Sequence, residues 1–275
     1  MSMITTTSIK TTSIAILCAM LSACASTTNN SVSGVQRSQL LLLPTSTVNQ
    51  MSSQSYTETL QVAKKNNTLN ADKALLTRVT TISNRLIAQV GVFRPDAAQW
   101  KWEVNVEKND QLNAYCMPGG KIMVFSGLAE KLKATDDELA AVIGHEIAHA
   151  LREHGRERMS QAYIQQFGLQ ALATVVGGTA GNMAAQGAGL GSQLLFSMPN
   201  GREQEREADR MGLELAARAG YNPEAAVSLW KKMMAANKEA PPEFLSTHPS
   251  SENRIKDLQA LTPKVMPLYL AAKSK

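Results

Sequence analysis

The hydrophobic positions of the chain change their period between its ends and its middle. From Asp72 to Val90 they recur every three to four residues, which predicts an amphipathic helix, and a helix is also predicted from Val48 to Ala63. Between Trp100 and Val106 apolar and polar residues alternate, which predicts a strand. Two further strand-like runs follow at 113–117 and 121–125, joined by a Pro-Gly-Gly turn signal.

Helical periodicity returns in the second half of the chain. A short helix is expected from Ser126 to Leu132, and the Thr-Asp-Asp-Glu run at 135–138 matches a capping box. A helix should therefore begin there and run to about Met159. Further helical stretches are expected at 161–173, 204–219 (ending at the C-cap residue Gly220), 223–237 and 251–261. The Gly/Ala-rich residues 177–191 are expected to be mobile. The sum is an α+β fold in which helices dominate and one small sheet is present.

The first residues are typical of a targeting segment. Lys10 is the only charged residue in 1–23, and Ser13–Leu21 is an apolar stretch too short to span a bilayer. It ends in Leu21-Ser22-Ala23-Cys24, which resembles a bacterial lipobox, and Ala25 rather than Asp follows. This resemblance implies lipidation of Cys24 and an outer-membrane lipoprotein on the periplasmic face of a Gram-negative bacterium. An ordinary cleaved signal peptide is the alternative. A mitochondrial presequence is disfavoured, because the segment lacks Arg and an amphipathic pattern.

This interpretation divides the chain into four parts. Residues 1–23 are the signal peptide, and 24–38 are the lipidated cysteine and a flexible tether rich in Ser, Thr and Asn. Residues 39–265 form one folded domain, and 266–275 are a C-terminal tail. Removal of residues 1–23 lowers the formal charge from +5 to +4. No dense Lys/Arg stripe with interleaved aromatic residues is present, so nucleic-acid binding is not expected.

Cysteine usage agrees with this division. Cys18 lies in the apolar signal and Cys24 would carry lipid, so the mature chain has Cys116 alone and no internal disulfide. Cys116 is expected to be a small buried residue, with a thiol metal ligand as the minority alternative.

The most specific signal is His145-Glu146-Ile147-Ala148-His149, an H-E-x-x-H sequence within a predicted helix. His145 and His149 share one helix face, and Glu146 is placed to reach a water bound to a metal between them. The alternative without a function is a helix that carries two exposed His and an unrelated Glu. The flanking residues are apolar, so burying these groups without partners would be costly, and a bound cation removes that cost. The sequence therefore predicts a metal-dependent hydrolase with one Zn²⁺ per chain.

A catalytic zinc keeps about three protein ligands and one water, so a further ligand is needed. His154 is the nearest candidate, but it follows His145 by two and a half helical turns. It is therefore predicted to face the other way, as a polar residue favoured at the helix end by the macrodipole.

The run at 203–209, Glu-Gln-Glu-Arg-Glu-Ala-Asp, offers better candidates. Glu205 and Asp209 share a helix face, so one carboxylate can ligate the metal while the other orients a ligating imidazole. Spacing alone does not decide which glutamate of this run ligates the metal. Glu203 and Glu207 are expected to form a solvated face with the neighbouring arginines.

Three motifs in this order resemble the M48 metallopeptidases. They are the H-E-x-x-H run at 145–149, Glu-Arg-Glu-Ala-Asp at 205–209 and Thr247-His248-Pro249. The segment 113–121 also resembles the family's segment before the active-site helix. The resemblance covers roughly residues 40–261 and, with the lipobox, points to small outer-membrane lipoprotein members.

The resemblance implies a zincin-like (gluzincin) metallopeptidase domain over 39–265, with its small sheet beside the active-site helix. It selects Glu205 as the third zinc ligand and Asp209 as the residue that orients a ligating His. By the same likeness His248 is an extra ligand in a closed, latent state or a group that stabilises the transition state. The alternative is that His248 caps the last helix.

The expected function is that of a zinc metalloendopeptidase, with Glu146 as general base and His248 as a second catalytic residue. Substrate is expected to pair as an extended segment with an edge strand. That strand comprises Lys121, Ile122, Met123, Val124 and Phe125. This binding mode suits unfolded chains, and the family resemblance implies unfolded or misassembled cell-envelope proteins as substrates and outer-membrane assembly proteins as partners.

Two other functions are weighed against this one. A latent or inactive homologue would act as a periplasmic chaperone or assembly factor, held at the membrane by the lipid on Cys24. A purely structural zinc is disfavoured, because two His, one Glu and a nearby base leave a coordination position open.

Overall fold

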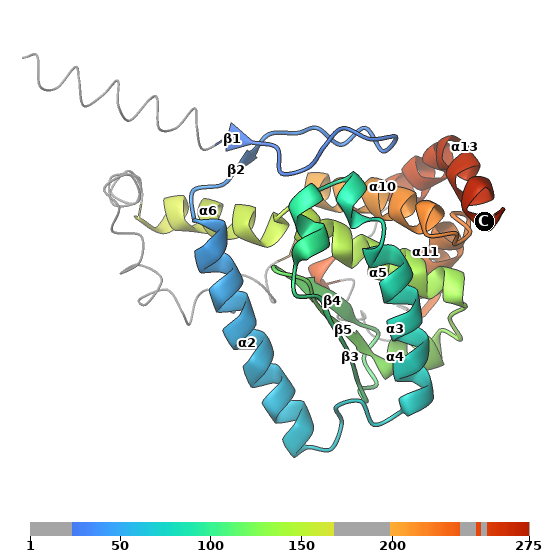
Figure 1. Cartoon of the computed structure of the whole chain (residues 1–275), viewed down its shortest axis with the longest axis horizontal. Coiled ribbons are helices and arrows are strands. Elements are labelled where there is room, and N and C mark those ends of the chain that lie inside the picture. Colours follow the sequence, from blue (N-terminus) through green and yellow to red (C-terminus); the bar gives the residue numbers. More distant parts are fainter. Residues whose placement is uncertain (1–23, 168–198, 237–245, 249–251, 275) are drawn as a thin grey trace, which may run out of the picture.

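The computed structural model describes residues 24–167, 199–236, 246–248 and 252–274 of the chain. The expected mobile segment 177–191 lies outside the described residues, as does the end of the helix expected at 161–173. The helices are α2 (Thr45–Lys65), α3 (Lys73–Ile87), η1 (Val90–Val92), η2 (Pro95–Gln99), α4 (Ser126–Lys131), α5 (Asp136–Leu151), α6 (His154–Phe167), α10 (Arg202–Arg218), α11 (Ala225–Ala236) and α13 (Glu252–Lys273) (Figure 1). The strands are β1 (Cys24–Ala25), β2 (Gln39–Leu40), β3 (Glu103–Glu107), β4 (Ala114–Met117) and β5 (Lys121–Phe125). The expected mostly helical α+β fold with one small central sheet is confirmed.

The central sheet has the strand order β3-β5-β4. β3 pairs with β5 in parallel and β4 pairs with β5 antiparallel. Gly119 and Gly120 make the tight β4–β5 turn with φ of +81° and +83°, a conformation that favours glycine. The prediction that Lys121–Phe125 is an edge strand is wrong, because both of its edges are paired. The continuous apolar run from Ile122 to Phe125 is typical of such a central strand, whereas local patterning does not specify strand order.

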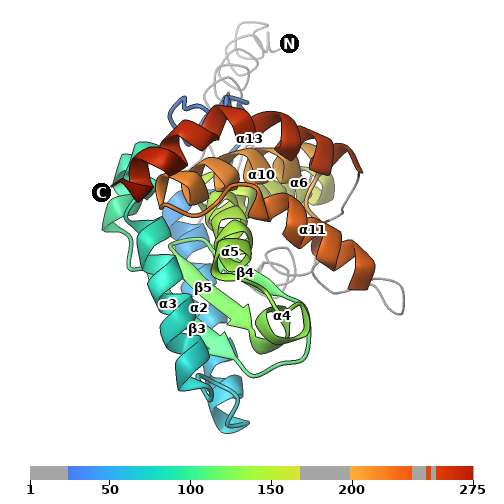
Figure 2. The same ribbon diagram turned by 90° about the vertical axis from the view of Figure 1, so that its right-hand side faces the viewer.

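Helix α5 is the central element of the molecule and packs against α10, α11, α3 and β4. Figure 2 shows α5 between the sheet and the layer of α10 and α13. All residues from Glu138 to Leu151 are buried. The expected capping box is confirmed: Thr135 Oγ1 accepts from Glu138 N at 3.2 Å, and Glu138 Oε2 accepts from Thr135 N at 2.9 Å.

Helix α5 ends earlier than its sequence pattern predicts, at Leu151 instead of about Met159. Glu153 adopts a positive φ of +51°, which turns the chain and starts α6 at His154. Glu153 accepts from Arg156 Nη1 at 2.6 Å and lies 3.3 Å from Arg94 Nη1, so two ion pairs hold this turn. A non-glycine residue in the left-handed region is uncommon, so the residue type at 153 does not mark the turn.

Two glycines let α5 and α10 cross backbone to backbone. A Cβ on Gly212 would lie 2.7 Å from His145 N, and a Cβ on Gly144 would lie 3.0 Å from Gly212 O. Side chains at these positions would force the helices apart, because a packed interior has no spare volume. The crossing therefore sets the depth of His145 relative to α10.

The N-terminal segment, defined here as residues 26–43, packs against the domain, whereas a flexible tether is expected over 24–38. Ser33 and Val35 are buried, and Ser33 N donates to Glu214 Oε2 at 2.6 Å. Figure 1 shows this segment running across α10. At the other end of the chain, α13 continues through the expected tail, with Val265 fully buried.

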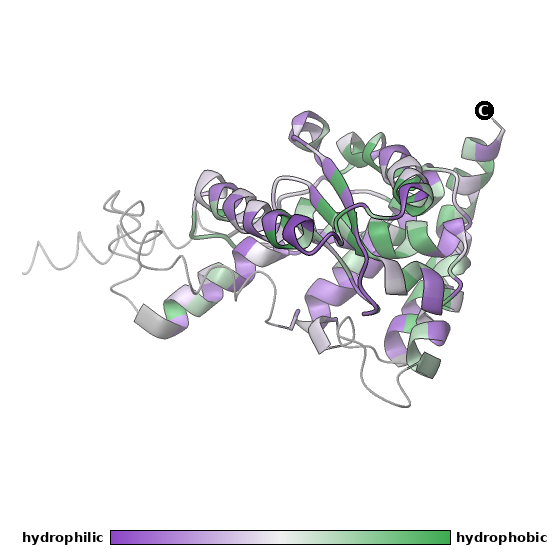
Figure 3. Cartoon of the chain, turned by 90° about the horizontal axis from the view of Figure 1, so that it is seen from below, coloured by the Kyte–Doolittle hydropathy of each residue, from purple (hydrophilic) through white to green (hydrophobic). Residues whose placement is uncertain are grey.

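The main core surrounds α5 and includes Ile122 and Val124 of β5, whereas Met117, Met123 and Phe125 form a smaller cluster with Tyr56 of α2. Figure 3 shows the hydrophobic residues gathered on the inner faces of the helices and strands, with hydrophilic residues on the outer faces. Among the described residues, no helix combines the length and apolar character that crossing a membrane requires.

Candidate active site

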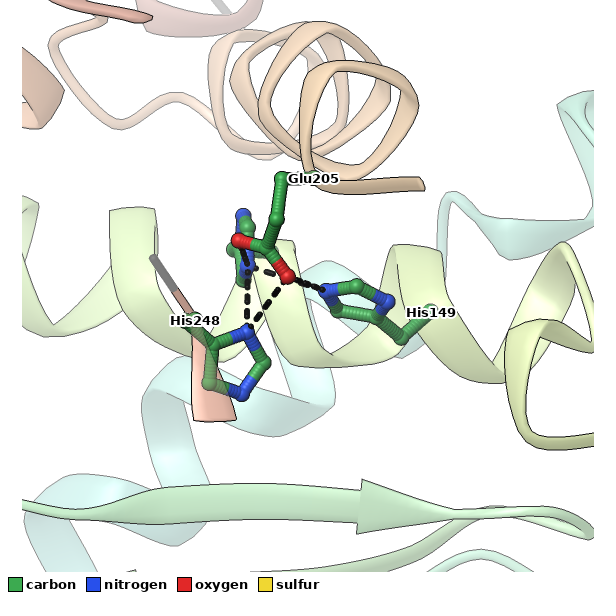
Figure 4. Close-up of side chains that lie close together, drawn as sticks. His149, Glu205 and His248 are labelled. Carbon is green, nitrogen blue, oxygen red and sulfur yellow. Dashed lines mark hydrogen bonds and ion pairs between the residues drawn. The ribbon is translucent and has the colours of Figure 1, made fainter. Parts of the chain in front are cut away.

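Four buried side chains bring one potential ligand atom each to within 4.8 Å of one another. His145 and His149 come from α5, Glu205 from α10, and His248 from the segment 246–248. The Nε2 atoms of His145 and His149 are 3.0 Å apart. The Glu205 carboxylate lies 3.4 Å from His145 Nε2 and 3.3 Å from His149 Nε2. Figure 4 shows Glu205 reaching down from α10 between His149 and His248.

His248 fills the fourth corner of this cluster. Its Nδ1 lies 2.9 Å from Glu205 Oε1 and 3.3 Å from His145 Nε2. Its Nε2 lies 3.6 Å from Glu146 Oε1. Asn200 holds the segment in place, since Asn200 N donates to Thr247 O at 2.9 Å. His248 therefore contacts the cluster. The alternative in which His248 only caps the last helix does not require this contact.

Asp209 holds the ring of His145 from behind. Its Oδ1 lies 3.0 Å from His145 Nδ1, and Arg254 donates to both oxygens of Asp209 at 2.6 Å. Arg254 Nη1 also lies 2.7 Å from Glu205 Oε2, so one buried guanidinium holds both carboxylates of α10. Arg254 was not identified from the sequence. Its only signal is its place on the last helix, six residues after His248.

His154 does not face away from the cluster, so that prediction is wrong. Because the chain turns at Glu153, the ring of His154 folds back until its Nδ1 is 2.8 Å from His149 Nδ1. The helix-turn argument assumed one continuous helix through this region. His154 is fully buried and its Nε2 lies 2.9 Å from Glu207 Oε2.

Glu207 is also buried, contrary to the solvated face expected for it. Its carboxylate accepts from Arg37 Nε at 2.9 Å and from Arg152 Nη2 at 3.2 Å. Arg37 belongs to the N-terminal segment, whose packing on α10 could not be predicted from the helix pattern. Glu203 does lie on the surface, paired with Arg206.

The contacts of the outer residues favour one proton position on each of the two α5 histidines. Asp209 Oδ1 lies 3.0 Å from His145 Nδ1, an ion-pair contact that favours a proton on Nδ1, so a neutral His145 presents a bare lone pair at Nε2. Glu207 accepts from His154 Nε2–H, so His154 Nδ1 accepts from His149 Nδ1–H. The Nε2 of His149 then also presents a lone pair.

Two lone pairs and a carboxylate thus converge on one buried point. Such an arrangement is repulsive unless a cation lies between the donors, and imidazole and carboxylate donors suit Zn²⁺. Glu146 Oε1 is buried and makes no hydrogen bond within the described residues, so it is available to a water at this point. The residues present therefore fit a metal ion.

The pKa shifts of the two carboxylates agree with this assignment. Burial acts to raise the pKa of Glu205, but His248, His145 and His149 outweigh it and hold that pKa well below its usual range. Burial raises the pKa of Glu146, although His248 and His145 oppose the shift. Glu205 is thus kept anionic, as a ligand must be, and Glu146 is moved toward the pKa range of a general base.

A cavity of about 360 Å³ opens beside the cluster. It is lined by the 113–118 segment that contains β4, by Glu146, His149 and His248, and by Ser55 and Thr59 of α2. Cys116 lies in this wall as a small buried residue, as expected, and is not part of the four-residue cluster. Among the described residues β4 is an edge strand of the sheet, and the cavity therefore brings β4, rather than β5, next to Glu146.

An H-E-x-x-H helix, a third donor on a second helix and a small sheet beside them define the zincin-like class of metallopeptidase folds. Residues 73–262 match Peptidase family M48, and the chain belongs to this family.

Several relatives carry protease names. The chain is 35% identical over 178 residues to Mitochondrial metalloendopeptidase OMA1 of Saccharomyces cerevisiae, covering 62% of this chain and 49% of the relative. It is 34% identical over 240 residues to Metalloendopeptidase OMA1, mitochondrial, of Bos taurus, covering 84% and 45%. It is 29% identical over 205 residues to Beta-barrel assembly-enhancing protease of Yersinia pestis, covering 71% and 40%. The chain thus spans less than half the length of each of these relatives.

Proposed function

We propose that this protein is a zinc-dependent endopeptidase that cleaves unfolded or misassembled proteins of the cell envelope. The observation that carries the proposal is the convergence of His145, His149 and Glu205 on one buried point beside Glu146. Metalloendopeptidase is also the named activity of several relatives.

The ligand roles follow from the donor set. His145 Nε2, His149 Nε2 and the Glu205 carboxylate would hold Zn²⁺, which when bound polarises a substrate carbonyl and lowers the pKa of a bound water toward ~7. Asp209 orients His145, and Arg254 fixes Asp209 by two charge-assisted hydrogen bonds and Glu205 by an ion pair. Arg254 thereby keeps the Glu205 carboxylate in place when no cation is present.

Glu146 would act as the general base. Its carboxylate takes a proton from the attacking water and returns it to the leaving amine, which accounts for the proton in both halves of the reaction. Burial favours this role, since it raises the pKa of Glu146 towards the pH at which a carboxyl can both accept and donate.

The free edge of β4 is the proposed docking site for substrate. Phe125 N donates to Asn113 O at 3.0 Å, and antiparallel ladders alternate, so the backbone groups of Ala114 and Cys116 point away from β5. Ala114 N already donates to Asn113 Oδ1 at 2.9 Å, so the Ala114 carbonyl and the backbone N–H and carbonyl of Cys116 are the groups proposed to pair with an extended substrate, a mode that reads main chain rather than sequence. Only an unfolded segment can offer its backbone in this way.

His248 is proposed to hold the site at rest. Its Nδ1 occupies the corner of the cluster where a fourth ligand would lie, so the cleaving state requires His248 to withdraw. In its withdrawn position, His248 can stabilise the negative charge that develops on the substrate carbonyl oxygen in the transition state. The contact of His248 with the cluster also favours a second candidate function, in which a latent protein binds clients without cutting them.

The location and clients are proposed from two lines of support. The lipobox at 21–24 supports an outer-membrane lipid anchor on Cys24. Relatives named Beta-barrel assembly-enhancing protease, in Yersinia pestis and Escherichia coli, support envelope clients and contact with outer-membrane assembly proteins. Labelling of cells with radioactive palmitate tests the anchor: the wild type should carry label and Cys24→Ser should not.

Cleavage of a permanently unfolded reporter protein tests the function. The wild type should cut it, a zinc chelator should stop cleavage, and added Zn²⁺ should restore it. Binding of the reporter without cleavage, in zinc-loaded protein, would overturn the endopeptidase in favour of the client-binding alternative.

A further inference from the structure

A second buried cluster of charged side chains lies behind His149, on the side away from the four ligand atoms. Its centre is the Glu207 carboxylate, which receives Arg37 Nε at 2.9 Å, Arg152 Nη2 at 3.2 Å and His154 Nε2 at 2.9 Å. Arg152 and His154 have no exposed surface. The three partners come from the N-terminal segment, the end of α5 and the start of α6. Glu207, on α10, therefore ties the N-terminal segment to the junction of α5 and α6.

This cluster touches the ligand atoms at one point, the contact of 2.8 Å between His154 Nδ1 and His149 Nδ1. The order of donors along the path runs from His149 Nδ1–H to His154 and from His154 Nε2–H to Glu207. Each hydrogen bond fixes the tautomer of the next ring. The lone pair at His149 Nε2 therefore depends on the Glu207 carboxylate, which is two hydrogen bonds away from the ring of His149. His145 has a shorter version of the same support, in which Asp209 Oδ1 lies 3.0 Å from His145 Nδ1.

We propose that His154 and Glu207 are positioning residues for His149, and that Arg37 of the N-terminal segment anchors this relay and so sets the affinity for zinc. The inference rests on the proposed zinc site. A ligand imidazole whose outer nitrogen loses its acceptor can rotate or change tautomer, and such losses typically weaken metal binding by about 10–100-fold.

Arg37 is the link to the N-terminal segment. It bridges two buried carboxylates, since its Nη1 lies 2.5 Å from Glu157 Oε1 while its Nε binds Glu207. Arg152 Nη2 also donates to the Arg37 carbonyl at 2.8 Å, and Gln39 Nε2 donates to the Arg152 carbonyl at 2.6 Å. Loss of the Arg37 guanidinium would remove the bridge between these two carboxylates and leave Glu207 with Arg152 and His154 alone, so Glu207 would be held less firmly against His154.

The test is the zinc affinity of the full chain, measured by competition with a chromophoric chelator, together with the melting temperature of the metal-free protein. His154→Leu removes the acceptor, and Glu207→Gln removes the negative charge and one of the two acceptor oxygens. Both should raise the Kd for zinc by about 10–100-fold. Arg37→Met should raise it several-fold. His154→Asn, whose carbonyl reaches the place of Nδ1, should bind more tightly than His154→Leu.

Matched controls separate positioning from packing. Glu203→Gln changes the same residue type one turn earlier on α10, at a surface pair. Arg78→Met removes an arginine whose side chain is 34% exposed, against 33% for Arg37, and which also pairs with an acid. Both controls should keep the wild-type Kd.

The outcomes are distinct. A wild type that binds no zinc refutes the proposed function and this inference with it. A wild type that binds zinc, with variants that melt earlier but keep its Kd, refutes the relay alone. If His154→Leu does not fold, Glu207→Gln and Arg37→Met decide. The chain has four histidines, so ¹⁵N NMR can also follow each ring, and coordination through His149 Nδ1 would equally refute the proposed tautomer.

Discussion

At the scale of single residues, three glutamates of one helix have three different environments. The side chain of Glu203 is 59% exposed, that of Glu205 is 1% exposed and that of Glu207 is 7% exposed. Glu203 and Glu207 are four apart and share a helix face, so their helical phase cannot explain the difference. The N-terminal segment covers Glu207 through Arg37 and leaves Glu203 in solvent. The helical pattern predicts that Glu205 lies on a different face from Glu203 and Glu207. It does not predict that Glu203 is exposed while Glu207 is buried.

The three glutamates should differ in what they do to bound zinc. Glu205→Ala removes a ligand, and the variant should lose nearly all zinc on dialysis, where the wild type keeps about one per chain. Glu203→Ala should keep the wild-type content. Glu207→Ala should bind zinc more weakly without losing it. Atomic absorption after dialysis against a weak chelator measures all three, and full zinc content in Glu205→Ala would remove it from the ligand set.

Glu146 should separate metal binding from chemistry. Glu146→Gln keeps the size of the side chain and removes its basicity, so activity should fall by about 10²–10⁴-fold while zinc content stays unchanged. Glu130→Gln, an exposed glutamate on α4, is the control and should cleave like the wild type. Cleavage of the reporter by Glu146→Gln at the wild-type rate would exclude Glu146 as the base.

At the scale of elements, the site depends on how closely α5 and α10 approach. His145 follows Gly144 directly, and Gly212 of α10 packs against the backbone of both residues. The side chains of Glu205 and Asp209, from the same helix, then meet the ring of His145. One crossing point between two helices thus sets the distance between ligands that are far apart in sequence.

Gly212→Ala should therefore disturb the site as well as the fold. The added Cβ would meet His145 N at 2.7 Å, which requires a backbone shift, and overpacking of this kind costs about 1–3 kcal/mol. The shift moves His145 from Glu205, so zinc affinity should also fall. Gly201→Ala is the control, because its Cβ would meet nothing closer than Gln204 Oε1 at 3.9 Å. Urea unfolding and chelator competition measure both effects, and an unchanged zinc Kd in Gly212→Ala would show that the crossing does not set the ligand distance.

Local sequence patterns predicted the elements better than their partners. The helix ends at Thr135 and Gly220 and the three sheet strands were predicted, because capping and alternation act over a few residues. The position of β5 between two strands was missed, since register and strand order depend on long-range pairing. His154 was misplaced because the turn at Glu153 has no glycine to mark it.

At the scale of the whole molecule, the candidate ligands come from elements that are far apart in the sequence, so a metal ion bound by them would link these elements. His145 and His149 lie on α5, Glu205 on α10, and His248 on a short segment ahead of α13. His145 and His149 were predicted from their own spacing, whereas Glu205 and His248 were selected through family resemblance, since no spacing rule connects residues 60 or 103 positions from His145. The outer support from Arg254 and Arg37 could not be predicted, because both residues reach the site only through tertiary packing.

Zinc should therefore stabilise the whole fold. A ligand that binds only the folded state, present at 100 times its Kd, contributes about 2.7 kcal/mol. For a domain of about 250 residues this corresponds to a rise in Tm of roughly 5–10 °C. Removal of zinc with a chelator should lower the Tm by that amount, and added Zn²⁺ should restore it. Glu146→Gln keeps every ligand and should show the full shift, whereas Glu205→Ala should show almost none. Equal shifts in these two variants would mean that zinc stabilises the protein from some other site.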